Sequence, residues 1–184
     1  MSLLIIGVIE WSLVHWIKRL APGFRQKMSD RMGEASKGVI ALLLVLSIVL
    51  MVLGYRAAPY IELWQLPRWA IHLNNLAMLG AVFLFGMSST TGRLRGRMRH
   101  PMLTAVIVWA LAHLMVNGDV ASLVLFGGMG AWAAISIILI NRAGPWQRPT
   151  PGPARKDIIL VVATVVMFII FSAVHAMIGP SPFG

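Results

Sequence analysis

Six long runs of apolar residues alternate with short polar segments along this chain of 184 residues. A helix of about 20 residues crosses a bilayer core about 30 Å thick, and each run approaches or reaches that length. Because hydrocarbon offers no partner to backbone N–H and C=O groups, each run is predicted to be a helix. The predicted helices cover residues 3–17, 38–57, 69–87, 101–116, 121–140 and 158–178.

These runs predict a single membrane domain over residues 1–184, with an all-α fold: a multi-pass transmembrane bundle of six helices. The first and fourth runs are short, but Lys and Arg residues beside them can complete a span by snorkelling. The chain opens without the basic segment and cleavage site of a secretory signal, so the first run is expected to remain as a helix. Residues 144–153 are rich in proline and are expected to form an extended linker.

The positions of Lys and Arg predict how the helices are oriented. Of the 16 basic residues, all but Arg56 and Arg68 fall in the first, third and fifth connections between the helices. Cytoplasmic loops of membrane proteins are enriched in Lys and Arg. The odd-numbered connections are therefore predicted to face the cytoplasm, which places both termini on the non-cytoplasmic side.

The composition narrows the kinds of site and partner. The net charge is +10, but the basic residues sit in short loops and form no continuous surface, so nucleic acid is not an expected partner. The sequence has 58% hydrophobic residues, and its surface must be solvated largely by lipid. It has no cysteine, which excludes disulfides, thiolate metal sites, iron–sulfur clusters and cysteine nucleophiles. A metal or cofactor would need histidine, carboxylate, methionine or backbone ligands.

Two histidines fall at similar predicted depths in the bilayer. His15 lies about 18 Å from the non-cytoplasmic end of the first helix, and His113 about 18 Å from the cytoplasmic end of the fourth. The two helices run in opposite directions, so these imidazoles lie within roughly 6 Å of one depth. Two imidazoles at one depth on different helices are the arrangement that bis-histidine haem ligation requires. His15 and His113 are therefore the predicted ligands of a haem iron.

Two further histidines are predicted near the non-cytoplasmic face. His72 begins the third helix and His175 ends the sixth, with Asn117 and Asp119 at the same face. Histidine and carboxylate in this position predict a weaker candidate site for a divalent metal or a proton relay. The alternative is that these histidines only form hydrogen bonds between helices.

The fourth helix carries the most distinctive pattern. Trp109, His113 and Asn117 are four residues apart and so share one helical face, which makes Trp109 and Asn117 candidate cofactor contacts beside His113. The fifth helix follows with Gly127, Gly128 and Gly130, small residues that let a neighbouring backbone or a flat ligand approach closely.

The fourth-helix region resembles the NnrU family of bacterial membrane proteins, and the resemblance extends over nearly the whole chain. It rests on Arg99-His100-Pro101-Met102, on Trp109 through Ser122, on Phe126-Gly127-Gly128, and on an opening with His15, Arg25 and Gly33-Glu34. The resemblance implies a bacterial cytoplasmic (inner) membrane protein. It also implies an association with denitrification, where the family is linked to nitrite and nitric oxide reductase activity without an established chemical role.

The family is also similar to the plant ζ-carotene isomerase, a membrane haem b enzyme whose two essential histidines match His15 and His113. This similarity implies haem b as the cofactor and an isomerase as one possible activity. Arg99-His100-Pro101 also resembles the isoprenylcysteine and phospholipid methyltransferases, which bind S-adenosylmethionine. This chain lacks the Glu-Glu pair that follows in those enzymes, which argues against methyltransferase activity.

The sequence thus predicts an integral membrane haem protein that acts in denitrification as a redox, sensing or accessory factor. Its expected partners are the lipid bilayer and components of nitrite or nitric oxide reductase. Two alternatives stay open. One is a haem-dependent isomerase of a carotenoid or other lipid, and the other is a membrane assembly protein without a cofactor.

Overall fold

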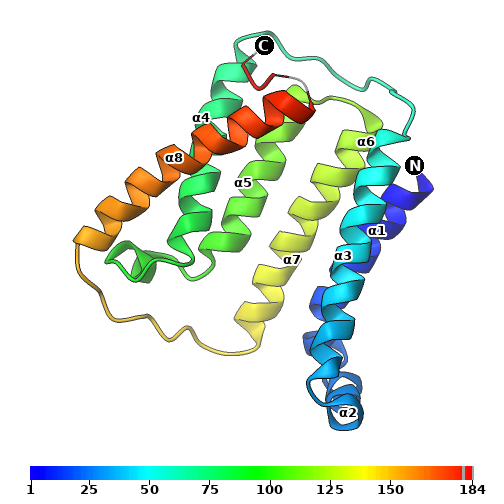
Figure 1. The fold of residues 1–184 in the computed structure, drawn as a ribbon, viewed down its shortest axis with the longest axis vertical. Helices are drawn as coiled ribbons and strands as arrows, with labels where there is room; N and C mark the ends of the chain where they lie inside the picture. Colours follow the sequence, from blue (N-terminus) through cyan, green and yellow to red (C-terminus); the bar gives the residue numbers. More distant parts are fainter. Residues whose placement is uncertain (180, 184) are drawn as a thin grey trace.

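A computed structural model describes residues 1–179 and 181–183, and within them the chain is helical, with one isolated bridge between Glu62 and Asp119 (Figure 1). A 3₁₀ turn covers Leu94–Arg97, and a π-helical turn at Leu123–Gly127 joins α6 to α7. The α-helices are α1 (Ser2–Leu20), α2 (Pro22–Met32), α3 (Ala35–Arg56), α4 (Ala70–Met87), α5 (Pro101–Val116), α6 (Val120–Ser122), α7 (Gly128–Arg142) and α8 (Arg155–Ile178).

The apolar runs coincide with helices, which confirms the all-α class. Four helical segments are long and apolar enough to cross a membrane: α3, α4, the continuous stretch Val120–Arg142, and α8. α5 is apolar but has only 16 residues, and α1 carries Glu10, Lys18 and Arg19, so these two fall outside that set. Four membrane-capable helices make this a membrane protein.

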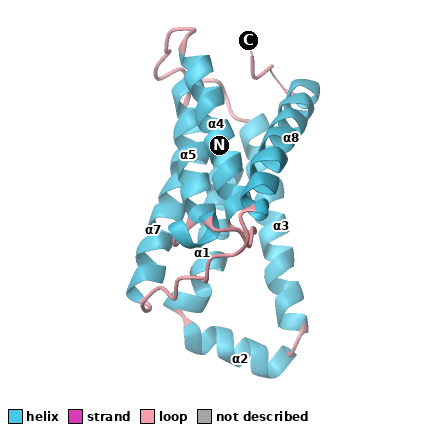
Figure 2. Cartoon of the chain, turned by 90° about the vertical axis from the view of Figure 1, so that its left-hand side faces the viewer, coloured by secondary structure: helices cyan, strands magenta, loops and turns pink. Residues whose placement is uncertain are grey.

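The first connection was expected to be a loop, and that expectation is wrong, because it contains helix α2. Pro22 stands in the first turn, where its missing N–H costs nothing, and Gly33 follows the helix with a φ of +54°. None of the residues of α2 is buried. Figure 2 shows α2 lying crosswise at one end of the bundle. This segment is rich in charged residues, so the pattern of apolar residues did not indicate that it is helical.

The helices lie side by side in the order α8, α4, α5, α7 and then the pair α1 and α3 (Figure 1). The most extensive packing joins α4 to α5 and α1 to α3. Close approach in the second pair depends on glycine, since a Cβ at Gly54 would lie 2.2 Å from the backbone nitrogen of Leu4. α7 packs against α5 and also against α1, so it stands at the centre of the row.

The polar connections separate into two ends. In Figure 1 both termini lie in the upper half, with the connection 57–69, whereas α2 and the connections 88–100 and 143–154 lie lower. The basic connections thus share one end, as the charge pattern requires. Residues 144–153 have no regular secondary structure, which confirms the extended linker. Outward-facing side chains of α8 such as Ile158 and Met177 are 66% and 83% exposed, as expected for contact with lipid.

Candidate functional site

His113 belongs to a connected group on the face of α5 that the sequence pattern identified. Its Nδ1 lies 3.0 Å from the carbonyl oxygen of Trp109, and Asn117 donates from Nδ2 to the carbonyl oxygen of His113 at 2.9 Å. The ring of Phe126 stacks on the imidazole with centroids 4.6 Å apart and meets Trp109 at 4.9 Å. We call these four residues the His113 cluster.

The hydrogen bond of His113 fixes what its ring can do. A carbonyl oxygen only accepts, so Nδ1 must carry the hydrogen, and the neutral imidazole then keeps a free lone pair on Nε2. Metal-ligating histidines commonly hold their second nitrogen in this way, which orients the ring. The His113 side chain is partly buried. Its Nε2 is therefore suited to ligate a metal at the edge of the bundle.

The π-helical turn positions Phe126 in this cluster. π-turns are rare in proteins, and those that do occur are often found at functional sites. On its amino-terminal side, Asp119 caps α6 by accepting from the backbone and hydroxyl of Ser122, and the Ser122 hydroxyl also meets the Tyr55 hydroxyl at 2.8 Å. The Tyr55 ring packs edge-on against Phe126 at 6.4 Å. α3 thus braces the turn that carries Phe126.

His15 lies in a second group, formed with Trp11 of α1 and Trp132 of α7, which we call the His15 cluster. The His15 and Trp11 ring centroids are 4.2 Å apart, His15 and Trp132 are 4.8 Å apart, and the two indoles 5.5 Å. His15 Nδ1 lies 2.8 Å from the carbonyl oxygen of Trp11. By the argument used for His113, its Nε2 also keeps a free lone pair.

The two clusters share a sequence signal that the depth argument did not use. Each histidine follows a tryptophan by four residues, as Trp11 to His15 and as Trp109 to His113. This Trp-x-x-x-His spacing places the indole one turn before the imidazole on the same face. The partners on the other helix, Trp132 and Phe126, could not be found this way because they come from tertiary packing.

His15 and His113 lie in two clusters that share no residue. Their partners Trp132 and Phe126 are six residues apart, which corresponds to about 9 Å along a helix. The clusters also lie on different sides of α7. A Cβ at Gly128 would lie 2.6 Å from Val8 of α1, whereas one at Gly130 would lie 3.2 Å from Ala110 of α5.

Each residue of an α-helix is rotated by about 100° around the helix axis, so side chains two residues apart point to nearly opposite sides. The two clusters thus contact residues 123–142 from α1 and from α5, and ligation of one iron by His15 and His113 together stays a prediction. The donor chemistry of either imidazole fits a ligand of haem iron. The sequence predicted that these glycines allow close approach. Gly128 and Gly130 do so, since they leave room for the neighbouring helices α1 and α5.

His72 and His175 are both exposed, on α4 and α8. Over the described part of the chain, no group of three or more His, Cys, Asp or Glu residues could hold a metal ion. α8 crosses in front of α4 in Figure 1 and packs against it. His175 has an electrostatic influence on His113, the smallest of those that act on it, which the sequence did not suggest. A divalent metal at His72 and His175 stays a prediction.

The Arg-His-Pro element has a structural role at the other end of the bundle. Arg99 donates from Nη2 to the carbonyl oxygens of Ile140 and Gly144 at 3.3 and 2.7 Å. Nε2 of His100 lies 2.8 Å from Oδ1 of Asn141. Together they tie the start of α5 to the carboxyl end of α7, where unpaired carbonyls need donors. These contacts account for the element without S-adenosylmethionine.

A polar cavity of about 260 Å³ lies at the upper end, between the connection 57–69 and the turn after α5. Partial desolvation and the carboxylates of Glu62 and Asp119 raise the pKa of Tyr60, which lines this cavity, above its usual value. The connection is held by bonds from the backbone of Leu63 and Trp64 to the Gly118 carbonyl at 2.7 and 3.0 Å. Asn117 and Asp119 also line this cavity, whereas His72 is not one of its lining residues.

Residues 3–182 match the protein-family model described as NnrU protein. No curated protein and no solved structure matches this chain. The matched region includes both histidine clusters and the helices named above, except for Ser2 at the start of α1. Since the match covers nearly the whole sequence, the chain belongs to the NnrU protein family.

Proposed function

We propose that this chain is a six-span inner-membrane protein that binds haem b, with His113 as an axial ligand of the iron. The observation that carries the proposal is the connected unit of Trp109, His113 and Asn117, three of the four cofactor contacts predicted from the sequence. The hydrogen bond to Trp109 leaves Nε2 as the only free nitrogen of the ring, and Phe126 holds the ring in place.

If His113 holds the iron of a haem, that iron would also be able to bind a small ligand such as nitric oxide. The NnrU family's association with denitrification makes nitric oxide the first ligand to test. In this proposal the protein serves nitrite or nitric oxide reduction as a redox, sensing or accessory factor.

The test is the visible absorption spectrum of the protein, oxidised and reduced, purified in mild detergent from haem-replete cells. The wild type is expected to show a Soret band that His113→Ala abolishes, because the iron loses its ligand. His15→Ala is the matched variant, from the same kind of cluster on the other side of α7, and should keep the band. Nitric oxide should shift the band of the reduced wild type.

Each other outcome contradicts a named part of the proposal. Loss of the band in both variants would mean that His15 and His113 share one iron. Loss only in His15→Ala would transfer the ligand to the other cluster. A folded wild type without a Soret band would favour the cofactor-free assembly protein.

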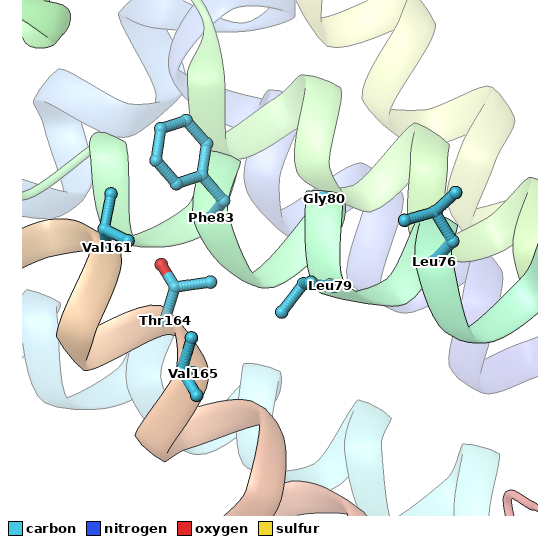
Figure 3. Close-up of a pocket in the computed structure, with 7 residues that line it drawn as sticks. All are labelled: Leu76, Leu79, Gly80, Phe83, Val161, Thr164 and Val165. Atoms are coloured by element: carbon cyan, nitrogen blue, oxygen red, sulfur yellow. The ribbon is translucent and has the colours of Figure 1, made fainter.

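A second candidate is a haem-dependent isomerase of a carotenoid or other lipid, and one feature favours it. A groove of about 380 Å³ lies between α4 and α8 and is lined almost entirely by apolar residues, among them Leu76, Phe83 and Val165 (Figure 3). A Cβ at Gly80 in this groove would meet nothing within 4 Å, so Gly80→Phe should fill it without unfolding the bundle. If the protein is an isomerase, this variant should lose turnover of ζ-carotene isomers and keep its haem.

A further inference from the structure

Two indole N–H groups in the His15 cluster have no hydrogen-bond partner among the described residues. They are Nε1 of Trp11 and Nε1 of Trp132, and both nitrogens are buried. Trp132 as a whole is only 7% exposed. Buried polar groups are nearly always hydrogen-bonded in proteins, so two orphaned donors in one cluster require an explanation.

Other hydrogen-bond donors near the His15 cluster have partners. Trp16, on the next turn of α1, donates from Nε1 to the Ser136 hydroxyl at 2.8 Å, and Ser12 donates to the Val8 carbonyl at 2.8 Å. The unpaired indoles are therefore particular to the His15 cluster. An acceptor that is not part of the chain would complete them.

His15 adds an acceptor beside these two donors. Its Nδ1 hydrogen is used by the Trp11 carbonyl, so Nε2 offers a lone pair to an incoming O–H group. The imidazole touches both indoles, and the side chain is only partly buried. The cluster thus combines two N–H donors, one acceptor and three ring faces between α1 and α7.

The setting selects the class of ligand. Within a bilayer an unpaired carboxylate or phosphate is costly, and no cation belongs to this cluster, so a neutral acceptor is favoured. Indole and imidazole faces favour a flat, conjugated ring. A carbonyl oxygen accepts from an indole, and the hydroxyl of the reduced form also donates to Nε2 of His15. A membrane-soluble quinone meets each of these conditions.

We propose that the His15 cluster is a quinone site in which Trp11 and Trp132 donate to a quinone or quinol oxygen and His15 accepts from the quinol hydroxyl. The site does not contain the proposed haem ligand His113, which belongs to the other cluster. It does not depend on haem binding.

The test uses full-length protein in mild detergent with ¹⁵N-labelled indoles, titrated with a short-chain ubiquinone and with its quinol. The Nε1 resonances of Trp11 and Trp132 should move on saturation, whereas that of Trp146 in the linker should not. Trp11→Phe and Trp132→Phe keep an aromatic ring, assign the two resonances, and should each weaken binding about tenfold. Trp146→Phe is the control, and its affinity should equal that of the wild type.

His15→Phe tests whether His15 accepts a hydrogen bond from the quinol hydroxyl. It should weaken binding of the quinol more than binding of the quinone. Indole resonances that show hydrogen bonding without ligand and ignore both compounds would mean that water fills the site, and would overturn the proposal. Equal affinity in Trp11→Phe, Trp132→Phe and wild type would also overturn it. The Soret band is read in the same samples, so failure of haem binding is scored independently.

Discussion

At the scale of single residues, His15 and His113 carry the same local arrangement in different surroundings. Each donates its Nδ1 hydrogen to the carbonyl oxygen of a tryptophan four residues earlier. His113 then stacks on Phe126, whereas His15 packs against two indoles with unpaired N–H groups. The same side chain is therefore suited to a metal in one cluster and to a hydrogen-bonding ligand in the other.

Replacing Phe126 tests the integrity of the His113 cluster. Phe126→Ala should lower the free energy of unfolding by about 3–5 kcal/mol, because the ring is 6% exposed and packs on three other rings. It should also loosen retention of haem, since His113 loses its stacking partner. Unfolding in mixed micelles, followed by circular dichroism, measures the first effect.

Leu123→Ala is the control for Phe126→Ala, because Leu123 lies in the same π-turn and is 44% exposed to the membrane side. It should change the free energy of unfolding by less than about 0.5 kcal/mol. Equal effects of the two substitutions would show that Phe126 has no particular role in this cluster.

Residue counting explains how far the site could be predicted. The number of residues from a helix end sets the depth of a side chain, so His15 and His113 could be placed along the membrane normal. The neighbours of a side chain within the membrane plane depend on which helices touch. The spacing of apolar residues does not predict that α7 packs against both α1 and α5. Trp132 and the unpaired indoles were missed for that reason, although the repeated Trp-x-x-x-His pattern marked Trp11.

At the scale of helices, the apolar runs predicted six positions because the hydrocarbon permits only helix there. The run at residues 101–116 coincides with α5, and the other boundaries shift by a few residues. α2 was missed because a surface helix of charged residues has no such requirement. Its existence depends on local signals at Pro22 and Gly33, which are weaker than a membrane-length run.

The contact between α1 and α3 gives a sharp prediction at this scale. Gly54→Ala should destabilise the pair, because the added Cβ would lie 2.2 Å from a backbone nitrogen that cannot move aside alone. The expected loss is about 1–3 kcal/mol, as for overpacking elsewhere. Gly38→Ala on the same helix is the matched control, since its Cβ would meet nothing within 4 Å. A comparison of thermal midpoints in detergent that ranks the two variants equally would contradict this packing.

At the scale of the whole molecule, the two ends of the bundle differ in charge. α2 and the connections 88–100 and 143–154 share the end opposite to the termini (Figure 1). If the basic end faces the cytoplasm, a reporter fused after Gly184 should lie on the non-cytoplasmic side. Alkaline phosphatase fused there should be active and green fluorescent protein dark.

The same pair of reporters inserted within residues 144–153 should give the reverse result, since this linker belongs to the basic end. Matching signals at both places would require an even number of spans between them and would exclude the six-span topology, which has one span, α8, between the two places. Removing basic residues from the connection 88–100 should weaken the orientation without altering the helices.

The π-helical turn has a consequence for how insertions and deletions can be tolerated. It holds one residue more than the same length of α-helix, and the wider turn absorbs that residue almost without rotating α7 relative to α6. An insertion or deletion elsewhere in a membrane helix would rotate everything after it by about 100°. The π turn is therefore the place where the stretch Val120–Arg142 can lose a residue while Ser122 keeps its bond to Tyr55 and α7 keeps its packing against α5.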